Sequence, residues 1–330
     1  MNYQLPNTFR VDLLYGALEK NPNALKKMRD AHGSDRYRPY FFPSDNSLSG
    51  MGLTPLGLTE YLLYLYRQDP ETHKNTLACI NWDPNCTPDF DPKFFEKMIG
   101  RMNSESKRAS FLIYRGNHTV SVMKEDDTLL LLDSYNAFGA KDSDHIPLLA
   151  NLRKNFPESK IFTLNDKIQN DYHNCAFFAA NSTGAIEKYL QHEGVSLAEF
   201  IQTLDTNKIH TPQRDNPGDC FKVQKYVEHG VRTIPVPPQL VSFVQSLTLA
   251  EKIADGSEEF VRGRPWHPYG SYAQELENFS AHERPRNCDK LKKMNIHMSV
   301  KNEMFDYASQ DCQTPATEIR GENRNAAISI

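Results

Sequence analysis

Short apolar runs that are typical of β-strands are concentrated in the middle of the chain. They lie at 110–114 (SFLIY), 119–123 (TVSVM), 128–132 (TLLLL) and 160–164 (KIFTL), and the first two are rich in residues that favour strands. The charged segment Lys124–Asp127 separates the second run from the third, as the turn of a hairpin would. The pattern therefore predicts a sheet in this part of the chain.

Longer segments before, within and after this region predict helices. Two of them precede it: 10–18, and 59–67 (TEYLLYLYR), which is amphipathic and has Thr59 as its N-cap. Another lies at 146–156, and 175–190 (CAFFAANSTGAIEKYL) predicts a mostly buried helix. Strands followed by helices in this mixture favour an α+β domain over a regular βαβ repeat.

These patterns divide the chain into four regions. We expect a helical N-terminal region at 1–105, a core at 106–203 and a helical or loop-rich extension at 204–283 that packs on the core. Residues 284–330 begin with a basic segment and end with few core-forming side chains. That composition predicts a polar, partly mobile tail.

Composition excludes several classes of protein. The net charge of the 330 residues is −4, without the basic excess of a nucleic-acid-binding protein. No apolar run approaches the roughly 18 residues of a membrane span, and the N-terminal residues do not resemble a Sec signal peptide. The six cysteines are widely spaced, so we expect thiols and neither disulfides nor a metal site.

Four residues with catalytic potential lie at or near the ends of the predicted elements. In chain order they are His118, Asp133, Gln169 and Cys175, all within 175 − 118 = 57 residues. A cysteine nucleophile needs a base, a group that orients the base, and a donor that stabilises the oxyanion. The four residues supply each of these groups. The sequence therefore predicts a cysteine-dependent acyl-transfer enzyme.

Cys175 is the candidate nucleophile because it begins a predicted helix. The unpaired N–H groups and the positive end of the helix dipole stabilise a thiolate there. The alternative is a buried structural cysteine, because the same segment also resembles a core helix. His118 directly precedes a strand and is the candidate base; His173, two residues before Cys175, is its rival.

The predicted hairpin brings together His118, the candidate base, and Asp133, the candidate group that orients it. If Met123 lies opposite Thr128, counting back five residues on each strand sets His118 opposite Asp133, where the carboxylate can hold the imidazole. The alternative is that Asp133 only forms a turn. Gln169, six residues before Cys175, could donate its side-chain amide to an oxyanion.

The order and placement of these residues resemble a clan of cysteine peptidases. It contains the ubiquitin-like-protein proteases (Ulp/SENP type), bacterial deubiquitinase effectors and the YopJ-family acetyltransferases. Their shared pattern is a His that opens a strand, an acidic residue that ends the next strand, and a Gln several residues before a helix-opening Cys. The resemblance implies a papain-like or Ulp-like core, in which a central mixed sheet is flanked by helical regions and the nucleophile begins a helix.

Two branches of the clan match different residues. The Asp133-Ser134 pair and the six-residue spacing from Gln169 to Cys175 look like the protease branch. That branch often has Trp where this chain has Thr119, and Asp-Cys-Gly where it has Asn-Cys175-Ala. The helix continuing to residue 190 and the segment 236–246 look like the acetyltransferase branch, although 241–245 lacks the basic pair of that branch's inositol hexakisphosphate site.

On these residues the first expectation is a cysteine isopeptidase, a bacterial effector-like deubiquitinase without a cofactor. Its partners would be ubiquitin or a ubiquitin-like protein and the conjugated host target, and it would act in the host cytosol after translocation. The alternatives are a YopJ-like acetyltransferase, which moves an acetyl group from acetyl-CoA to Ser, Thr or Lys of host proteins, and a non-catalytic interaction module.

Overall fold

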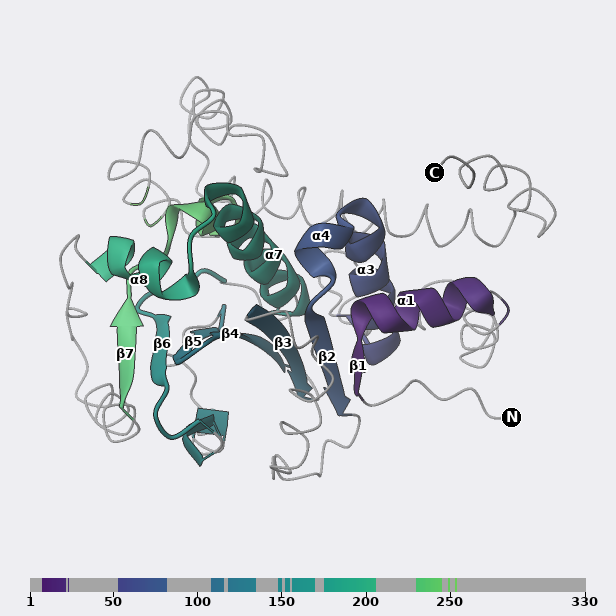
Figure 1. Ribbon diagram of the computed structural model, residues 1–330, viewed down its shortest axis with the longest axis horizontal. Coiled ribbons are helices and arrows are strands. Elements are labelled where there is room, and N and C mark those ends of the chain that lie inside the picture. Colours follow the sequence, from purple (N-terminus) through teal and green to yellow (C-terminus); the bar gives the residue numbers. More distant parts are fainter. Residues whose placement is uncertain are drawn as a thin grey trace, which may run out of the picture.

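A computed structural model shows one mixed sheet with most of its helices on one side (Figure 1). The structure describes residues 8–21, 23, 53–81, 108–115, 118–134, 148–149, 152–154, 156–169, 175–205, 230–244, 249 and 253. The expected tail at 284–330 lies outside these residues. No helix within them is long and apolar enough to span a membrane.

Seven strands lie in the sheet in the order in which they occur in the chain. The outer pair β1–β2 is antiparallel and β2–β3 is parallel; β3, β4 and β5 form an antiparallel meander, and β5, β6 and β7 are parallel. The strands are β1 (Thr8–Arg10), β2 (Thr76–Asn81), β3 (Arg108–Arg115), β4 (His118–Glu125), β5 (Thr128–Leu132), β6 (Lys160–Leu164) and β7 (Val231–Ile234). The four predicted strands are therefore confirmed as the centre of the sheet.

The sheet is wider than the sequence predicts, because three further strands come from regions expected to be helical or loop-like. β1 and β2 belong to the N-terminal region at 1–105, and β7 belongs to the extension at 204–283. β1 and β7 have only three and four residues, too few to show an alternating pattern. β2 has no partner close to it in sequence; it pairs with Phe111 and its neighbours across a long connection. The region at 1–105 therefore contains two strands besides the helices expected there.

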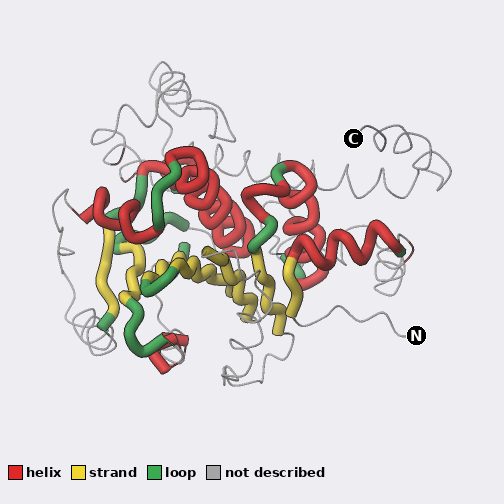
Figure 2. The backbone as a smooth tube through the Cα atoms, viewed as in Figure 1, coloured by secondary structure: helices red, strands yellow, loops and turns green. Residues whose placement is uncertain are grey.

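Helices α1 (Val11–Lys20), α3 (Pro55–Gln68), α4 (Pro70–His73), α7 (Cys175–Glu193) and α8 (Leu197–Asp205) lie on the same side of the sheet (Figure 2). The short 3₁₀ helix η2 (Pro238–Phe243) packs against α7. The expected helices at the N-terminus and at Cys175 are confirmed, and helical residues within 148–154 agree with the helix predicted at 146–156.

The N-cap predicted for α3 was wrong by five residues. The hydroxyl of Thr54 accepts the N–H of Gly57 at 3.0 Å, and Pro55 occupies the first helical position, where its missing N–H costs nothing. Thr59 lies inside the helix, and its hydroxyl donates to the carbonyl of Pro55 at 2.8 Å. The helix therefore begins one turn earlier than the amphipathic pattern suggests.

Helix α7 separates two parts of the core on one face of the sheet. Phe178 packs into an apolar cluster with α8, β5, β6 and η2, whereas its neighbour Phe177 packs into another cluster with α1, α3, β2 and β3. The opposite face of the sheet is covered by Leu148, Leu149 and Leu152. Because α7 is enclosed by both clusters, burial of its apolar side chains fixes where its first residue lies.

Candidate active site

Cys175 is the first residue of α7, and its side chain is almost completely buried. The helix contacts β3, β4 and β5. A helix N-terminus presents N–H groups without intrahelical partners and the positive end of the dipole. The prediction that Cys175 begins a helix is therefore confirmed.

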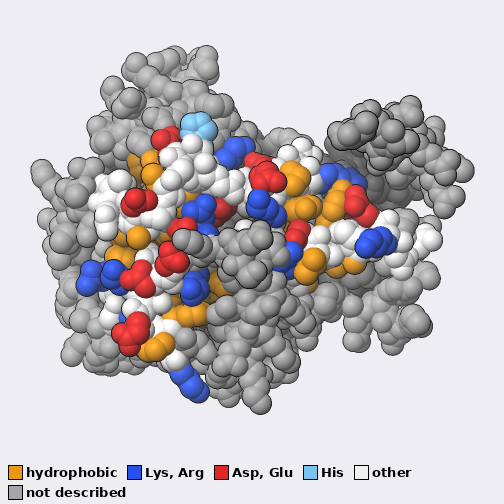
Figure 3. Space-filling view, in the orientation of Figure 1, with side chains coloured by type: hydrophobic (Ala, Val, Ile, Leu, Met, Phe, Trp, Pro, Cys, Tyr) orange, Lys and Arg blue, Asp and Glu red, His pale blue; other side chains and the backbone are white. Residues whose placement is uncertain are grey.

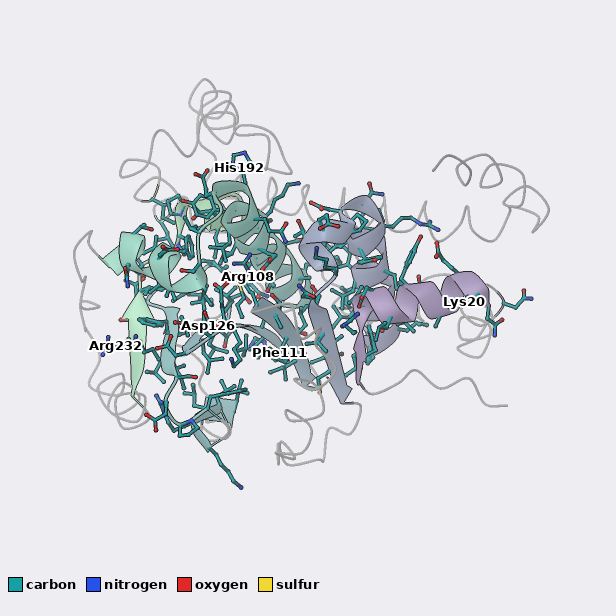
Figure 4. The ribbon with its side chains drawn as sticks, viewed as in Figure 1. Lys20, Arg108, Phe111, Asp126, His192 and Arg232 are labelled. Carbon is teal, nitrogen blue, oxygen red and sulfur yellow. The ribbon has the colours of Figure 1, made fainter. Side chains whose placement is uncertain are left out.

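Three polar contacts hold α7 at defined points along its length. The hydroxyl of Tyr61 in α3 donates to Oδ1 of Asn181 at 2.5 Å. The hydroxyl of Thr183 donates to that of Ser121 in β4 at 2.7 Å. Nearer the end of α7, Arg108 of β3 binds Glu187 with a shortest distance of 2.9 Å; Figure 4 shows Arg108 beside the helix. Together with apolar packing, these contacts fix the position of the cysteine relative to the sheet.

His118 and Asp133 are in contact, as the sequence predicts. Nε2 of His118 lies 3.1 Å from Oδ1 of Asp133. His118 begins β4 and its side chain is 24% exposed, whereas the carboxylate of Asp133, one residue after β5, is completely buried. A rigid strand thus supports the imidazole, and a buried carboxylate orients it.

The register behind this prediction, however, was wrong by two residues. Met123 pairs with Leu130, and Thr128 pairs with Glu125, because the hairpin turn contains only two residues. The first of them, Asp126, has φ 45°, in the left-handed region that such short turns require. Extended by one pair, this register makes Asp133 a diagonal neighbour of His118. A shift of two keeps every side chain on its face of the sheet, so the contact survives.

The environment of His118 favours its charged form. Burial alone would lower the pKa of the imidazole, but the carboxylate of Asp133 and a hydrogen bond and charge at Cys175 outweigh burial and raise the pKa of His118 to about 10. The ring is therefore an imidazolium at neutral pH. Because Nε2 contacts Asp133, Nδ1 is the ring nitrogen left for the hydrogen bond with Cys175.

Gln169 lies in a short loop that is attached to the residue after Asp133. The carbonyl of Ser134 accepts the backbone N–H of Ile168 at 3.0 Å and that of Gln169 at 2.9 Å. The Ser134 hydroxyl also donates to Oε1 of Gln169. Both side chains are buried. The structure therefore places Gln169, the candidate oxyanion donor, in contact with Ser134, the residue that follows Asp133.

Two residues of this region were not assigned a role from the sequence. One is Ser134, for which the sequence offers only its place in the Asp133-Ser134 pair. The other is Tyr114, the last aromatic residue of a predicted strand; burial, followed by the charge at Cys175, raises the pKa of its phenol. Its hydroxyl donates to the carbonyl of Leu53 at 3.3 Å. An aromatic residue at a strand end gave no signal that it lies near the thiol.

The remaining candidates do not form a second centre within the described part of the chain. Cys79 is mostly buried in β2, and burial raises the pKa of its thiol to about 12, so it stays protonated. Across the described segments, no three His, Cys, Asp or Glu side chains are grouped as metal ligands. His173, the rival of His118, lies outside the described residues. Basic and acidic side chains are interspersed on the face shown in Figure 3.

Comparison with solved structures finds bacterial effectors of the YopJ family. HopZ1a in complex with IP6 is 12% identical and covers 78% of this chain and 84% of its own, with a TM-score of 0.44. AvrA delL154 with IP6 and CoA is 13% identical and covers 81% of this chain and 89% of its own, with a TM-score of 0.39. The sequence matches no protein-family model and no curated protein.

Proposed function

We propose that this protein is a cysteine-dependent acyl-transfer enzyme in which Cys175 is the nucleophile, His118 the acid and base, Asp133 the orienting group and Gln169 an oxyanion donor. The observation that carries the proposal is the position of the His118 ring, which contacts Asp133 at 3.1 Å and shares a hydrogen bond with Cys175. A cysteine, an imidazole and an orienting carboxylate in this order form the catalytic unit of cysteine acyl transfer.

The first half of the reaction forms a thioester on the enzyme. With the proton on His118, the sulfur of Cys175 attacks the carbonyl carbon of the acyl donor, and the carbonyl oxygen becomes an oxyanion. The side-chain amide of Gln169 and a backbone N–H at the start of α7 donate to it. When the bond to the leaving group breaks, the His118 proton passes to that group. The acyl group then remains on Cys175, with His118 neutral.

The second half of the reaction depends on the acceptor. His118 takes the proton of an attacking O–H or N–H group, the new bond to the acyl carbon forms, and the bond to Cys175 breaks. This step restores the charged pair. A Ser, Thr or Lys side chain of a protein gives an acylated product, whereas water gives hydrolysis.

Transfer of an acetyl group from acetyl-CoA to a host protein is the first of two candidate reactions. Within the segment at 236–246, which resembles the acetyltransferase branch, the described residues include η2, which packs against the nucleophile helix. Leu240 and Phe243 of η2 share an apolar cluster with Phe178 and Ile186 of α7. At the nucleophile, Ala176 stands where the protease branch has Gly. The flanking regions 1–105 and 204–280 would provide the surface on which the acceptor protein docks. Action inside a host cell after translocation belongs to the same proposal.

Removal of ubiquitin or a ubiquitin-like modifier is the second candidate. The Asp133-Ser134 pair and the spacing from Gln169 to Cys175 support it, and the structure links both features through the hydrogen bond from Ser134 to Gln169. In this reaction the isopeptide C–N bond breaks, the lysine amine takes the proton, and water releases the modifier from Cys175. Both candidates therefore use the same first step.

A paired assay separates the candidates. The full-length protein is incubated with radiolabelled acetyl-CoA, with and without IP6, and in parallel with a ubiquitin probe that carries a C-terminal electrophile. Label from acetyl-CoA that depends on Cys175 supports the transferase, and covalent capture of the probe supports the isopeptidase. IP6 and a CoA thioester are chosen because the AvrA structure contains IP6 and CoA.

Cys175→Ala and Cys79→Ala form a matched pair of variants for this assay. Each removes one thiol from a largely buried site, but only Cys175 contacts the imidazole. We expect Cys175→Ala to abolish labelling and Cys79→Ala to keep it. If neither reagent labels the wild-type protein, and iodoacetamide leaves Cys175 unmodified in the folded state, the protein is a non-catalytic module and the proposal is wrong.

A further inference from the structure

Ser134 follows Asp133, the candidate orienting group, and makes two kinds of contact with the loop that carries Gln169, the candidate oxyanion donor. Its backbone carbonyl accepts two N–H groups from the loop at 168–169 and thereby holds the loop. Its side-chain hydroxyl separately donates to Oε1 of Gln169. Only the second contact depends on the identity of the side chain, because any residue at 134 supplies the same carbonyl.

We propose that Ser134 is a positioning residue, whose hydroxyl sets the orientation of the Gln169 amide so that the NH₂ group is the end directed away from Ser134. The inference rests on the proposed function of Gln169. A glutamine amide has one accepting and one donating end of nearly equal shape. A hydroxyl that donates to Oε1 stabilises one of the two orientations, and in that orientation Nε2 can donate to an oxyanion.

The position of the hydrogen bond explains why its loss would affect one step of the reaction. Both partners are buried. A partner that loses this hydrogen bond therefore cannot replace it with one to water without a cost in free energy. Without the Ser134 hydroxyl, the observed orientation loses a hydrogen bond that favours it. The flipped amide, in which Oε1 would face the negative charge of the oxyanion, then becomes more populated. The thiol, the imidazole and Asp133 keep their contacts, because none of them involves this hydroxyl.

Two electrophiles of different chemistry isolate this effect in the full-length protein. Iodoacetamide alkylates sulfur by displacing iodide, and no oxyanion forms. p-Nitrophenyl acetate acylates sulfur through a tetrahedral oxyanion and releases p-nitrophenolate, which absorbs visible light. The ratio of the two rates at Cys175 therefore reports on oxyanion stabilisation, and it is independent of whether the natural acceptor is a protein side chain or water.

We expect Ser134→Ala to lower the rate constant of acylation at saturating ester by roughly tenfold or more, up to the roughly 10²–10³-fold loss that follows removal of a whole oxyanion donor. The alkylation rate should stay within about twofold of wild type. Ser134→Thr keeps a hydroxyl and should restore much of the acylation rate. Thr59→Val is the control, since it also removes a buried, hydrogen-bonded hydroxyl, but one that donates to the carbonyl of Pro55 within α3.

A double variant tests whether Ser134 acts through Gln169. Gln169→Ala alone should lose at least as much acylation as Ser134→Ala, and Ser134→Ala should add no further loss in the Gln169→Ala background. Equal acylation by wild type and Ser134→Ala, or an additive loss in the double variant, would overturn the inference. Wild-type protein that is alkylated at Cys175 but never acylated would instead contradict the proposed function. Thermal unfolding of each variant identifies any loss that comes from misfolding.

Discussion

Nε2 of His118 lies 3.1 Å from Oδ1 of Asp133, although the two residues are not paired in the sheet. They come from the ends of two adjacent antiparallel strands and meet diagonally, a distance that a long side chain can span. The contact therefore depends on a hairpin turn of two residues and on the length of the imidazole. It is the geometric basis of the catalytic unit proposed for this protein.

The charge of Asp133 should control the protonation of His118. The carboxylate and Cys175 together raise the pKa of His118 to about 10. Burial lowers the pKa of His118, and Asp133→Asn removes the negative charge that offsets this effect. We therefore expect the pKa of His118 to fall toward its ordinary value of about 6.5 or below. NMR titration of the imidazole ring measures this directly.

Asp127→Asn is the matched control for that titration. Asp127 lies in the turn of the same hairpin, and its exposed carboxylate pairs with Lys160 at 3.2 Å, far from the ring along the strand. The pKa of His118 should be the same as in wild type. If His118 still titrates near pH 10 in Asp133→Asn, the carboxylate of Asp133 is not the group that keeps the imidazole charged.

The same pair should make stability depend on alkaline pH. The pKa of His118 is about 10 in the folded protein and about 6.5 in the unfolded chain. The folded state binds the proton more tightly, so the stabilisation is fully present below about pH 6.5 and is lost as pH rises through 10. The free energy of unfolding, measured with urea from pH 6 to 10, should fall more steeply in wild type than in His118→Asn. In an Asp133→Asn background this difference in slope should be much smaller; an undiminished difference would assign it to another group.

Gly184 in α7 should not tolerate a side chain, because α4 lies against it. An added Cβ would lie 2.9 Å from Cε1 of His73, which is buried. We expect Gly184→Ala to lower the free energy of unfolding by about 1–3 kcal/mol, the usual cost of overpacking. Gly16→Ala in α1 is the control, since a Cβ there meets nothing within 4 Å. The helix propensity of alanine should make that variant neutral or more stable by up to about 1 kcal/mol. Similar destabilisation by both substitutions would contradict the packing argument.

Arg108 should be important for stability because it pairs with two carboxylates. Its guanidinium binds Glu187 at 2.9 Å and Glu125 at 3.3 Å, and all three side chains are mostly buried. Burial raises the pKa of Glu187 despite this contact. Arg108→Ala would leave both carboxylates without their cation, which typically costs about 3–5 kcal/mol.

A second substitution and a surface control test the Arg108 prediction by urea denaturation. Glu187→Gln in the Arg108→Ala background removes one of the two charges and should recover part of the loss. Lys74→Ala breaks an exposed ion pair with Glu71 and should change stability by less than about 1 kcal/mol. If Arg108→Ala behaves like Lys74→Ala, the buried pair contributes little.

The sequence by itself determined the elements whose signal is local. The runs at 128–132 and 160–164 coincide with β5 and β6, and the helix begins at Cys175, because strand and helix periodicity are properties of neighbouring residues. The facing of His118 and Asp133 was also determined, since alternation along a strand survives a register shift of two. The sequence did not determine the length of the hairpin turn. Lys124 and Glu125 have side chains typical of a turn, but they pair within the sheet.

Only the tertiary structure decided what depends on residues distant in the chain. β2 becomes a strand beside β3, and Thr54 caps α3 one turn before the amphipathic pattern begins. The hydrogen bond from Ser134 to Gln169 joins residues 35 positions apart, and no pattern in their local sequence predicts it. A hydrogen bond or strand pairing between distant segments is specified by how the whole core packs. Local pattern therefore predicted the contact within the hairpin, but not the contacts between segments far apart in the chain.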